Sequence, residues 1–211
     1  MSNARHSSEG NEHYTPSEVV AAARATLDVI DLDPASCAAA NKTVGALEYY
    51  TKEQNGLMLP WTGNVFVNPP GGWCDNLGRQ VVKRTKDAPP CSESGACGLK
   101  APHVHDAAES SQKRWWQELV ANWAAGDVWN AIFVCFSIEL LQTTQVDAQG
   151  PIPLDFPICY PARRVAYTKE DGTVGRSPPH ASAIICVSRD PAVVARFKKE
   201  FSPLGRVVEP K

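Results

Sequence analysis

The sequence predicts an α/β fold whose sheet is mostly parallel and ends in a C-terminal antiparallel hairpin. Short apolar runs rich in β-branched and aromatic residues, such as 65–67, alternate with segments that have helical apolar spacing. Near the C-terminus, the runs 159–167 and 183–187 flank Asp171 and Gly172, a dipeptide typical of hairpin turns. These observations predict parallel strands first and an antiparallel pair at one edge of the sheet.

The first predicted helix covers residues 17–27. Thr15 is a residue type that caps helices, Pro16 suits the first helical position, and Glu18 has the spacing of a capping box. The segment 29–36 follows as a short strand that ends in an acid and a proline.

The run 65–67 predicts a buried strand that ends in a rigid elbow. Pro69 and Pro70 cannot continue the strand past Asn68. In open α/β sheets the carboxyl ends of strands form the ligand crevice, so Asn68 is placed for chemistry. A polar cap followed by a proline turn is the alternative.

Four elements complete the predicted order. Residues 115–123 have the apolar spacing of an amphipathic helix that ends near Gly126. The run 131–136 predicts a central strand, and a helix through residues 138–142 follows it. Residues 191–201 predict a last helix packed on the sheet. This alternation indicates a Rossmann-like sheet.

The sequence resembles the S-adenosylmethionine-dependent adenine-N6 DNA methyltransferases, and most closely the small phage-type Dam-like proteins. The motifs that carry the resemblance are Tyr14-Thr15-Pro16, the run 31–36, the stretch 39–51 with Asn55, Gly56, Leu57 and Trp61, the run 65–70, Arg163-Arg164-Val165 and the run 177–182. The likeness covers most of the chain, with a gap from about residue 87 to residue 110.

The resemblance implies a class I methyltransferase fold and methyl transfer from S-adenosylmethionine to the N6 amino group of adenine in DNA. Asn68 and the carbonyl of Pro69, within a motif completed by Pro70, would accept hydrogen bonds from that amino group. Acceptors that hold its hydrogens and favour a pyramidal nitrogen would expose the lone pair to a sulfonium methyl group. In a duplex, the adenine would be flipped out of the stack.

The resemblance also implies which residues meet the methyl donor. Thr15, with Tyr14 and Pro16, would lie near the methionine carboxylate, helped by the amino terminus of the following helix. Asp31 or Asp33 would face the donor's ammonium group. Three further residues complete the expected donor site: Pro34, Ser36 and Asn55. A strand end at Asp33 and a helix cap at Thr15 are the alternatives.

Two positions depart from the wider methyltransferase pattern. Ala35 and Ser36 follow the first strand where a glycine-rich turn normally lets backbone approach the cofactor. Gly71 stands where an aromatic residue normally stacks on the flipped base. We expect Trp73 to supply that platform instead, with a contribution of about 1–3 kcal/mol per base.

The formal net charge of -2 gives no overall attraction to nucleic acid, so DNA contacts must come from local clusters. One cluster, on a predicted helix after the elbow, comprises Arg79, Lys83, Arg84 and Lys86. The other flanks the predicted hairpin and comprises Arg163, Arg164, Lys169 and Arg176. A solvated helix face explains the first, so we expect the second to contact phosphates.

Length and composition favour one domain over residues 1–211, because 211 residues with 43% hydrophobic content can bury a sizeable core. No apolar run approaches the roughly 20 residues that cross a bilayer, and the polar start lacks a signal-peptide core. With the resemblance, this predicts a soluble protein in the cytoplasm of a bacterium or phage-infected host cell. The seven cysteines fit buried, reduced thiols.

Residues 87–110 form a predicted insertion with four soft or borderline metal ligands: Cys91, Cys97, His103 and His105. Two thiolates and two imidazoles suit a structural zinc ion, which would order the segment. The five residues between the cysteines exceed the usual spacing, so a plain loop is the alternative. The zinc hypothesis predicts about one equivalent of metal per chain.

The leading hypothesis is a DNA adenine-N6 methyltransferase. One alternative is a catalytically degraded DNA-binding relative, which Gly71 and the missing glycine-rich turn favour; Asn68 with its prolines and Asp33 favour the enzyme. The other is an amino-methyltransferase that acts on cytosine N4 or RNA. By the resemblance, Asn at position 68 indicates adenine.

Overall fold

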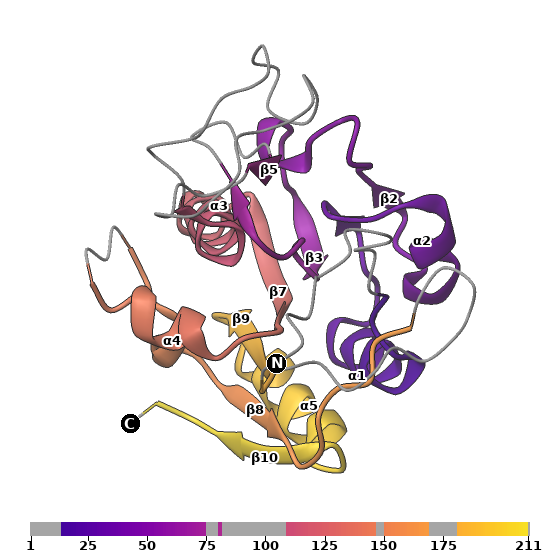
Figure 1. Cartoon of the computed structure of the whole chain (residues 1–211). Helices are drawn as coiled ribbons and strands as arrows, with labels where there is room; N and C mark the ends of the chain where they lie inside the picture. Colours follow the sequence, from indigo (N-terminus) through magenta and orange to yellow (C-terminus); the bar gives the residue numbers. More distant parts are fainter. Residues whose placement is uncertain (1–13, 75–79, 82–108, 147–149, 169–180, 211) are drawn as a thin grey trace, which may run out of the picture.

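The computed structural model describes residues 14–74, 80–81, 109–146, 150–168 and 181–210. Its main feature is a seven-stranded sheet with the order β10-β8-β9-β7-β3-β1-β2 (Figure 1). Four strands form the parallel part: β1 (Leu32–Asp33), β2 (Glu48–Tyr49), β3 (Gly63–Val67) and β7 (Val128–Cys135). An α/β fold with a mixed sheet, parallel at its core, is therefore confirmed.

The C-terminal strands are antiparallel. β9 (Ala183–Ser188) pairs with β7, β8 (Ile158–Pro161) pairs with β9, and β10 (Gly205–Val208) pairs with β8. The antiparallel β8 and β9 pair is confirmed, but its predicted position at the sheet edge is wrong, because β10 lies outside β8. Residues 171–172, the predicted turn, lie outside the described residues.

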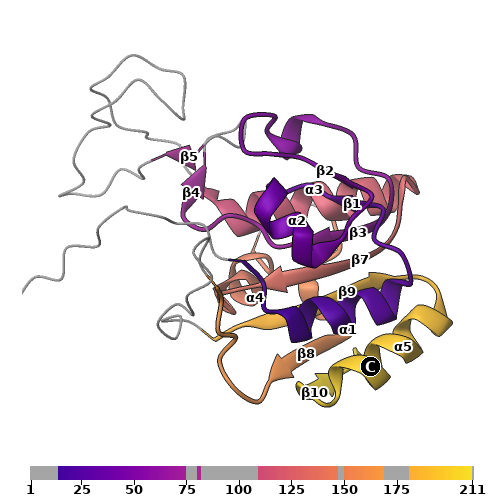
Figure 2. The ribbon, with the colours of Figure 1, turned by 90° about the vertical axis from the view of Figure 1, so that its right-hand side faces the viewer.

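Helices cover both faces of the sheet (Figure 2). The helices are α1 (Ser17–Leu27), α2 (Ala38–Val44), α3 (Ser111–Ala125), α4 (Glu139–Thr143) and α5 (Pro191–Phe201). α3 and α4 contribute to the core on one face, whereas α1 and α5, which lie side by side, contribute to the core on the other. Among the described residues, no helix has the length and apolar character needed to span a membrane.

The central strands show why two cores form. Val65 and Val67 belong to the core with α3, whereas Phe66 between them belongs to the core with α1 and α5. All three side chains are 0% exposed. Successive side chains of a strand point to opposite faces, so a continuous apolar run is what a strand covered on both sides requires.

A small antiparallel sheet with the order β5-β4-β6 lies beyond β3 in the chain. Its strands are β4 (Trp73–Cys74), β5 (Gln80–Val81) and β6 (Glu109–Ser110). We predicted a helix for the basic segment 79–86. Residues 80–81 are a strand instead, and the rest of that segment lies outside the described residues. Pairing with β4 overrides the local pattern here.

The start of α1 also differs from the prediction. Pro16 occupies the N-cap position, and no side chain caps the helix. The backbone carbonyl of Pro16 accepts from the N–H groups of Val19 and Val20, both at 3.1 Å. Thr15 is buried, at 6% exposure, one residue before the cap. The predicted capping role of Thr15 is therefore wrong.

Candidate active site

The carboxyl ends of β1, β3 and β7 lie next to one another. These strands are parallel, and the register pairs Leu32 with Val65 and Val67 with Phe133. The turn after β1, the elbow after β3 and the residues after β7 therefore emerge from the same edge of the sheet (Figure 1). In α/β sheets this edge carries the ligand site.

Asp33, the last residue of β1, is a buried carboxyl at this edge. It is 2% exposed, and its Oδ1 accepts from the N–H of Ala35 at 3.2 Å. Burial raises the pKa of Asp33 from 3.8 to about 7, while the nearby Ser36 hydroxyl and the Ala35 N–H lower it to a smaller extent. No basic side chain among the described residues forms an ion pair with it. A cationic ligand group would supply the missing charge.

The start of the short helix η1 (Gly56–Met58) packs closely on the turn after β1. A Cβ atom added at Gly56 would lie 2.0 Å from the carbonyl oxygen of Pro34, so only glycine fits this approach. The Gly56 carbonyl accepts from Nε1 of Trp61 at 2.7 Å, which holds the loop in place. Asn55, with a φ of 53°, is thereby positioned beside Asp33's turn.

Unsatisfied polar atoms surround this turn. The buried Ser36 hydroxyl and the Nε1 of Trp115 have no hydrogen-bond partner of normal geometry among the described residues. A ring atom of Trp115 lies 3.2 Å from the Cβ position built at Gly56, so the indole is close to the same loop. Buried polar groups in folded proteins are normally paired, so the Ser36 hydroxyl beside the Asp33 carboxyl suits a polar ligand at the end of β1.

The predicted elbow follows β3 and contacts the amino terminus of α3. Asn68 is half-buried, Pro69 is buried, and Gly71 is exposed. The N–H of Ser111, the first residue of α3, donates to the carbonyl of Gly72 at 3.1 Å. Gly72 has a φ of 88°, a conformation that favours glycine. The elbow is thus held between β3 and a fifteen-residue helix.

The first residue after β7 contacts the same elbow. The N–H of Phe136 donates to Oε1 of Gln112 at 3.1 Å, and Gln112 is buried. A Cβ atom added at Gly71 would lie 3.1 Å from Cζ of Phe136. Phe136 and Gln112 were not predicted as site residues. For Phe136 a signal existed, because it ends the predicted strand 131–136 at the edge that carries Asn68.

No family model, no curated protein and no solved structure matches this chain.

The residues before α1 are brought to the start of α2. The backbone of Tyr14 pairs with that of Thr168, at 2.8 and 3.1 Å. The Cys37 thiol donates to the Tyr14 hydroxyl at 3.5 Å, and Cys37 directly follows Ser36. Tyr14, Thr15 and Pro16 therefore lie on the same side of the sheet edge as the turn after β1.

Asp31 is not brought together with these residues. Its Oδ2 accepts from the N–H of Asn64 at 2.7 Å, at the amino end of β3. Asn64 precedes Asn68 by four residues, or about 13 Å along a strand. The Asp31 carboxylate links the residue before β1 to the amino end of β3. Asp33 lies at the carboxyl end of β1.

The expected substrate residues lie on two different elements. Trp73 is half-buried in β4, paired with Ser110 of β6. Arg163 and Arg164 are exposed directly after β8. β8 is antiparallel to β9, which is antiparallel to β7, so β8 runs in the same direction as β3. Both arginines therefore follow a carboxyl end at the edge that carries Asn68.

Six predicted residues lie outside the described residues: Lys169, Arg176, Cys91, Cys97, His103 and His105. The zinc hypothesis and the phosphate contacts stay predictions. In the part of the chain that the structure describes, no three His, Cys, Asp or Glu side chains form a group that could hold a metal ion.

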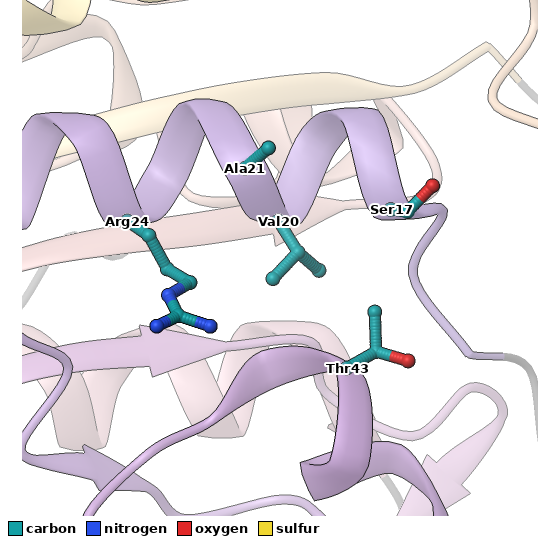
Figure 3. Close-up of a pocket in the computed structure, with 5 residues that line it drawn as sticks. All are labelled: Ser17, Val20, Ala21, Arg24 and Thr43. Carbon is teal, nitrogen blue, oxygen red and sulfur yellow. The ribbon is translucent and has the colours of Figure 1, made fainter.

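Two pockets lie away from this edge cluster. One, of about 360 Å³, lies between α1 and α2, where Val20 extends toward Thr43 and Arg24 lies to one side of it (Figure 3). The other, of about 250 Å³, lies between α3 and the segment 150–152. Neither is lined by Asp33, Asn68 or their neighbours, so both are distinct from the candidate site.

Proposed function

We propose that this protein is a site-specific DNA methyltransferase that transfers a methyl group from S-adenosylmethionine to N6 of adenine. The observation that carries the proposal is the position of the Asn68-Pro69-Pro70 elbow at the carboxyl end of β3, beside the buried Asp33 at the end of β1. A parallel sheet followed by an antiparallel C-terminal pair agrees with the class I methyltransferase fold that this activity requires.

The residues at the end of β1 fit the methyl donor. A methionine ammonium group would pair with the Asp33 carboxylate, which has no cationic partner among the described residues. The Ser36 hydroxyl beside the Asp33 carboxyl offers a further polar contact in the same region. Tyr14, Thr15 and the amino terminus of α1 would meet the donor carboxylate.

The chemistry needs positioning rather than a covalent intermediate. S-adenosylmethionine supplies a methyl group that is electrophilic because it is bonded to a sulfonium. Asn68 Oδ1 and the carbonyl of Pro69 accept hydrogen bonds from the adenine N6 hydrogens, which favours a pyramidal nitrogen with an exposed lone pair. The N6 lone pair forms the N–C bond as the S–C bond breaks, and that bond's electron pair stays on sulfur. The extra N6 proton then passes to solvent.

Substitution of Asn68 tests the catalytic assignment. We expect Asn68→Ala to abolish methylation while S-adenosylmethionine still binds, because Asn68 is assigned to the acceptor base and not to the donor. The measurements are calorimetric titration with the donor and its demethylated product, and mass analysis of digested DNA for N6-methyladenine.

The matched control is Asn122→Ala. Asn122 is a half-buried asparagine on α3 whose side chain donates to Glu118, one turn earlier. We expect this variant to keep wild-type activity. Full activity of Asn68→Ala would contradict the catalytic role of the elbow.

A degraded DNA-binding relative is the second candidate, because Gly71 replaces the aromatic residue expected after the elbow. The same titration separates the two proposals. A degraded relative binds DNA without binding the donor, whereas the enzyme binds both and forms product. Mass analysis for N4-methylcytosine, and a parallel assay with RNA, test the alternative acceptors.

A further inference from the structure

The space beside the elbow is filled by an aromatic ring from the neighbouring strand. A Cβ atom at Gly71 would meet three ring atoms of Phe136: Cζ at 3.1 Å, Cε2 at 3.6 Å and Cε1 at 3.8 Å. The shortest of these separations is tighter than an ordinary van der Waals contact. A side chain at position 71 and the Phe136 ring therefore compete for the same place.

Strand register explains how Phe136 reaches this place. Val67 of β3 pairs with Phe133 of β7 in parallel. Pro70 and Phe136 each lie three residues after this pair, beyond the ends of the two strands, and neighbouring strands are about 4.8 Å apart. The Phe136 ring thus lies just after β7, beside Pro70 and Gly71.

The surroundings of Phe136 hold its backbone and leave part of the ring accessible. Its N–H donates to the buried Gln112, while the ring packs against the core formed with α1 and α5. The residue is only half-buried, although the five preceding residues of β7 are 0% exposed. A planar ligand at the elbow would find an aromatic surface that the fold has already placed.

Trp73, the platform that sequence analysis selected, is tied to a different element. It lies in β4, where it pairs with Val81 on one side and Ser110 on the other. The backbone of Trp73 is thus part of the small sheet, whereas Phe136 directly follows β7, the strand that pairs with β3.

We propose that Phe136 is the aromatic residue on which the flipped adenine stacks, in place of an aromatic side chain at position 71. This inference rests on the proposed function and adds a substrate-binding residue to it. The ring and the two acceptors of the elbow come from adjacent strands, so together they contact one face and the amino edge of the same base.

Phe136→Leu tests the proposal, because it keeps an apolar side chain and removes the aromatic face. We expect kcat/KM for DNA methylation to fall roughly 5- to 150-fold, the range that corresponds to loss of one base-stacking contact. Phe136→Tyr retains the ring and should stay close to wild type. Trp129→Leu is the matched control, since Trp129 is an exposed aromatic residue near the amino end of the same strand.

Two further measurements keep the test independent of folding defects. Titration with S-adenosylhomocysteine should give wild-type affinity for Phe136→Leu. A duplex in which 2-aminopurine replaces the target adenine reports stacking of the flipped base, because stacking quenches its fluorescence. We expect brighter fluorescence with Phe136→Leu than with wild type. The double variant Gly71→Tyr with Phe136→Ala relocates the ring and should recover activity relative to Phe136→Ala alone.

The outcomes separate this inference from the proposed function. Methylation and 2-aminopurine fluorescence unchanged by Phe136→Leu, in a wild-type protein that makes N6-methyladenine, would overturn the stacking role alone. A wild-type protein that neither binds the donor nor methylates DNA would overturn the proposed function and the stacking role with it.

Discussion

Asp31 and Asp33 are the same residue type on the same short segment, yet the fold gives them different surroundings. Asp31 accepts from the N–H of Asn64 at the amino end of the strands. Asp33 is buried at the carboxyl end, where desolvation raises its pKa to about 7. Sequence analysis left the two as alternatives because a one-dimensional pattern does not specify which residue lies level with the elbow.

The raised pKa of Asp33 predicts that the free energy of unfolding decreases with pH. At a pH between the ordinary pKa of 3.8 and the folded-state pKa of about 7, Asp33 is protonated in the native state and ionised in the unfolded chain. The native state then binds more protons, so rising pH destabilises it, by roughly a few kcal/mol across this window. Urea unfolding at pH 5 and pH 8 measures the effect.

Asp33→Asn should remove this contribution and be more stable than wild type at pH 8. The same substitution at Asp127, whose side chain is exposed, is the control and should keep the wild-type difference between the two pH values. An unchanged pH dependence in Asp33→Asn would show that the buried carboxyl is not its source.

At the scale of elements, periodicity identified the structures that cross the core. Four predicted elements are confirmed, because each buries an apolar face of regular spacing. They are the strand 131–136 and the helices 17–27, 115–123 and 191–201. β10 was missed. It is four residues long, and its exposed Arg206 and Val208 alternate with half-buried neighbours, so its pattern is too short to distinguish it from a loop.

The start of η1 is expected to control the donor site. Gly56→Ala would place a Cβ atom 2.0 Å from the Pro34 carbonyl oxygen, so the turn that carries Asp33 must shift. We expect a loss of roughly 1–3 kcal/mol in the free energy of unfolding, the size typical of overpacking, and at least tenfold weaker donor binding. Denaturant unfolding and calorimetry measure these effects.

Gly150→Ala is the matched control for that substitution. A Cβ atom there would lie 3.7 Å from the nearest side-chain atom, on Val120, which is an ordinary contact. We expect unchanged donor affinity and a stability change within about 0.5 kcal/mol. Equal effects of the two substitutions would argue against a close approach at Gly56.

At the scale of the whole molecule, one edge of the sheet collects the polar and basic groups. The elbow after β3, the turn after β1 and the arginines after β8 all emerge there. β8 lies three strand positions from β3, which corresponds to about 14 Å. Arginines at this distance from Asn68 suit contacts to phosphates that flank a flipped base.

Substitution of the two arginines tests this surface. Arg163→Ala and Arg164→Ala should each weaken DNA binding similarly for all sequences, and each should reduce the slope of log K against log salt by about 1. Lys42→Ala is the control, because Lys42 is exposed on α2 near the amino edge of the sheet. Fluorescence anisotropy over a salt series measures both quantities. Identical slopes in all three variants would exclude a phosphate contact at the arginines.

The sequence by itself determined the α/β class, the positions of the main helices and strands, and the elbow at Asn68, because apolar spacing and prolines act locally on the chain. Tertiary structure alone decided which residues share the site. It separated Asp33 from Asp31, placed Gly56 against Pro34 and brought Phe136 to Gly71. These contacts join strands and loops far apart in the sequence, so they depend on register and burial, which no local pattern specifies.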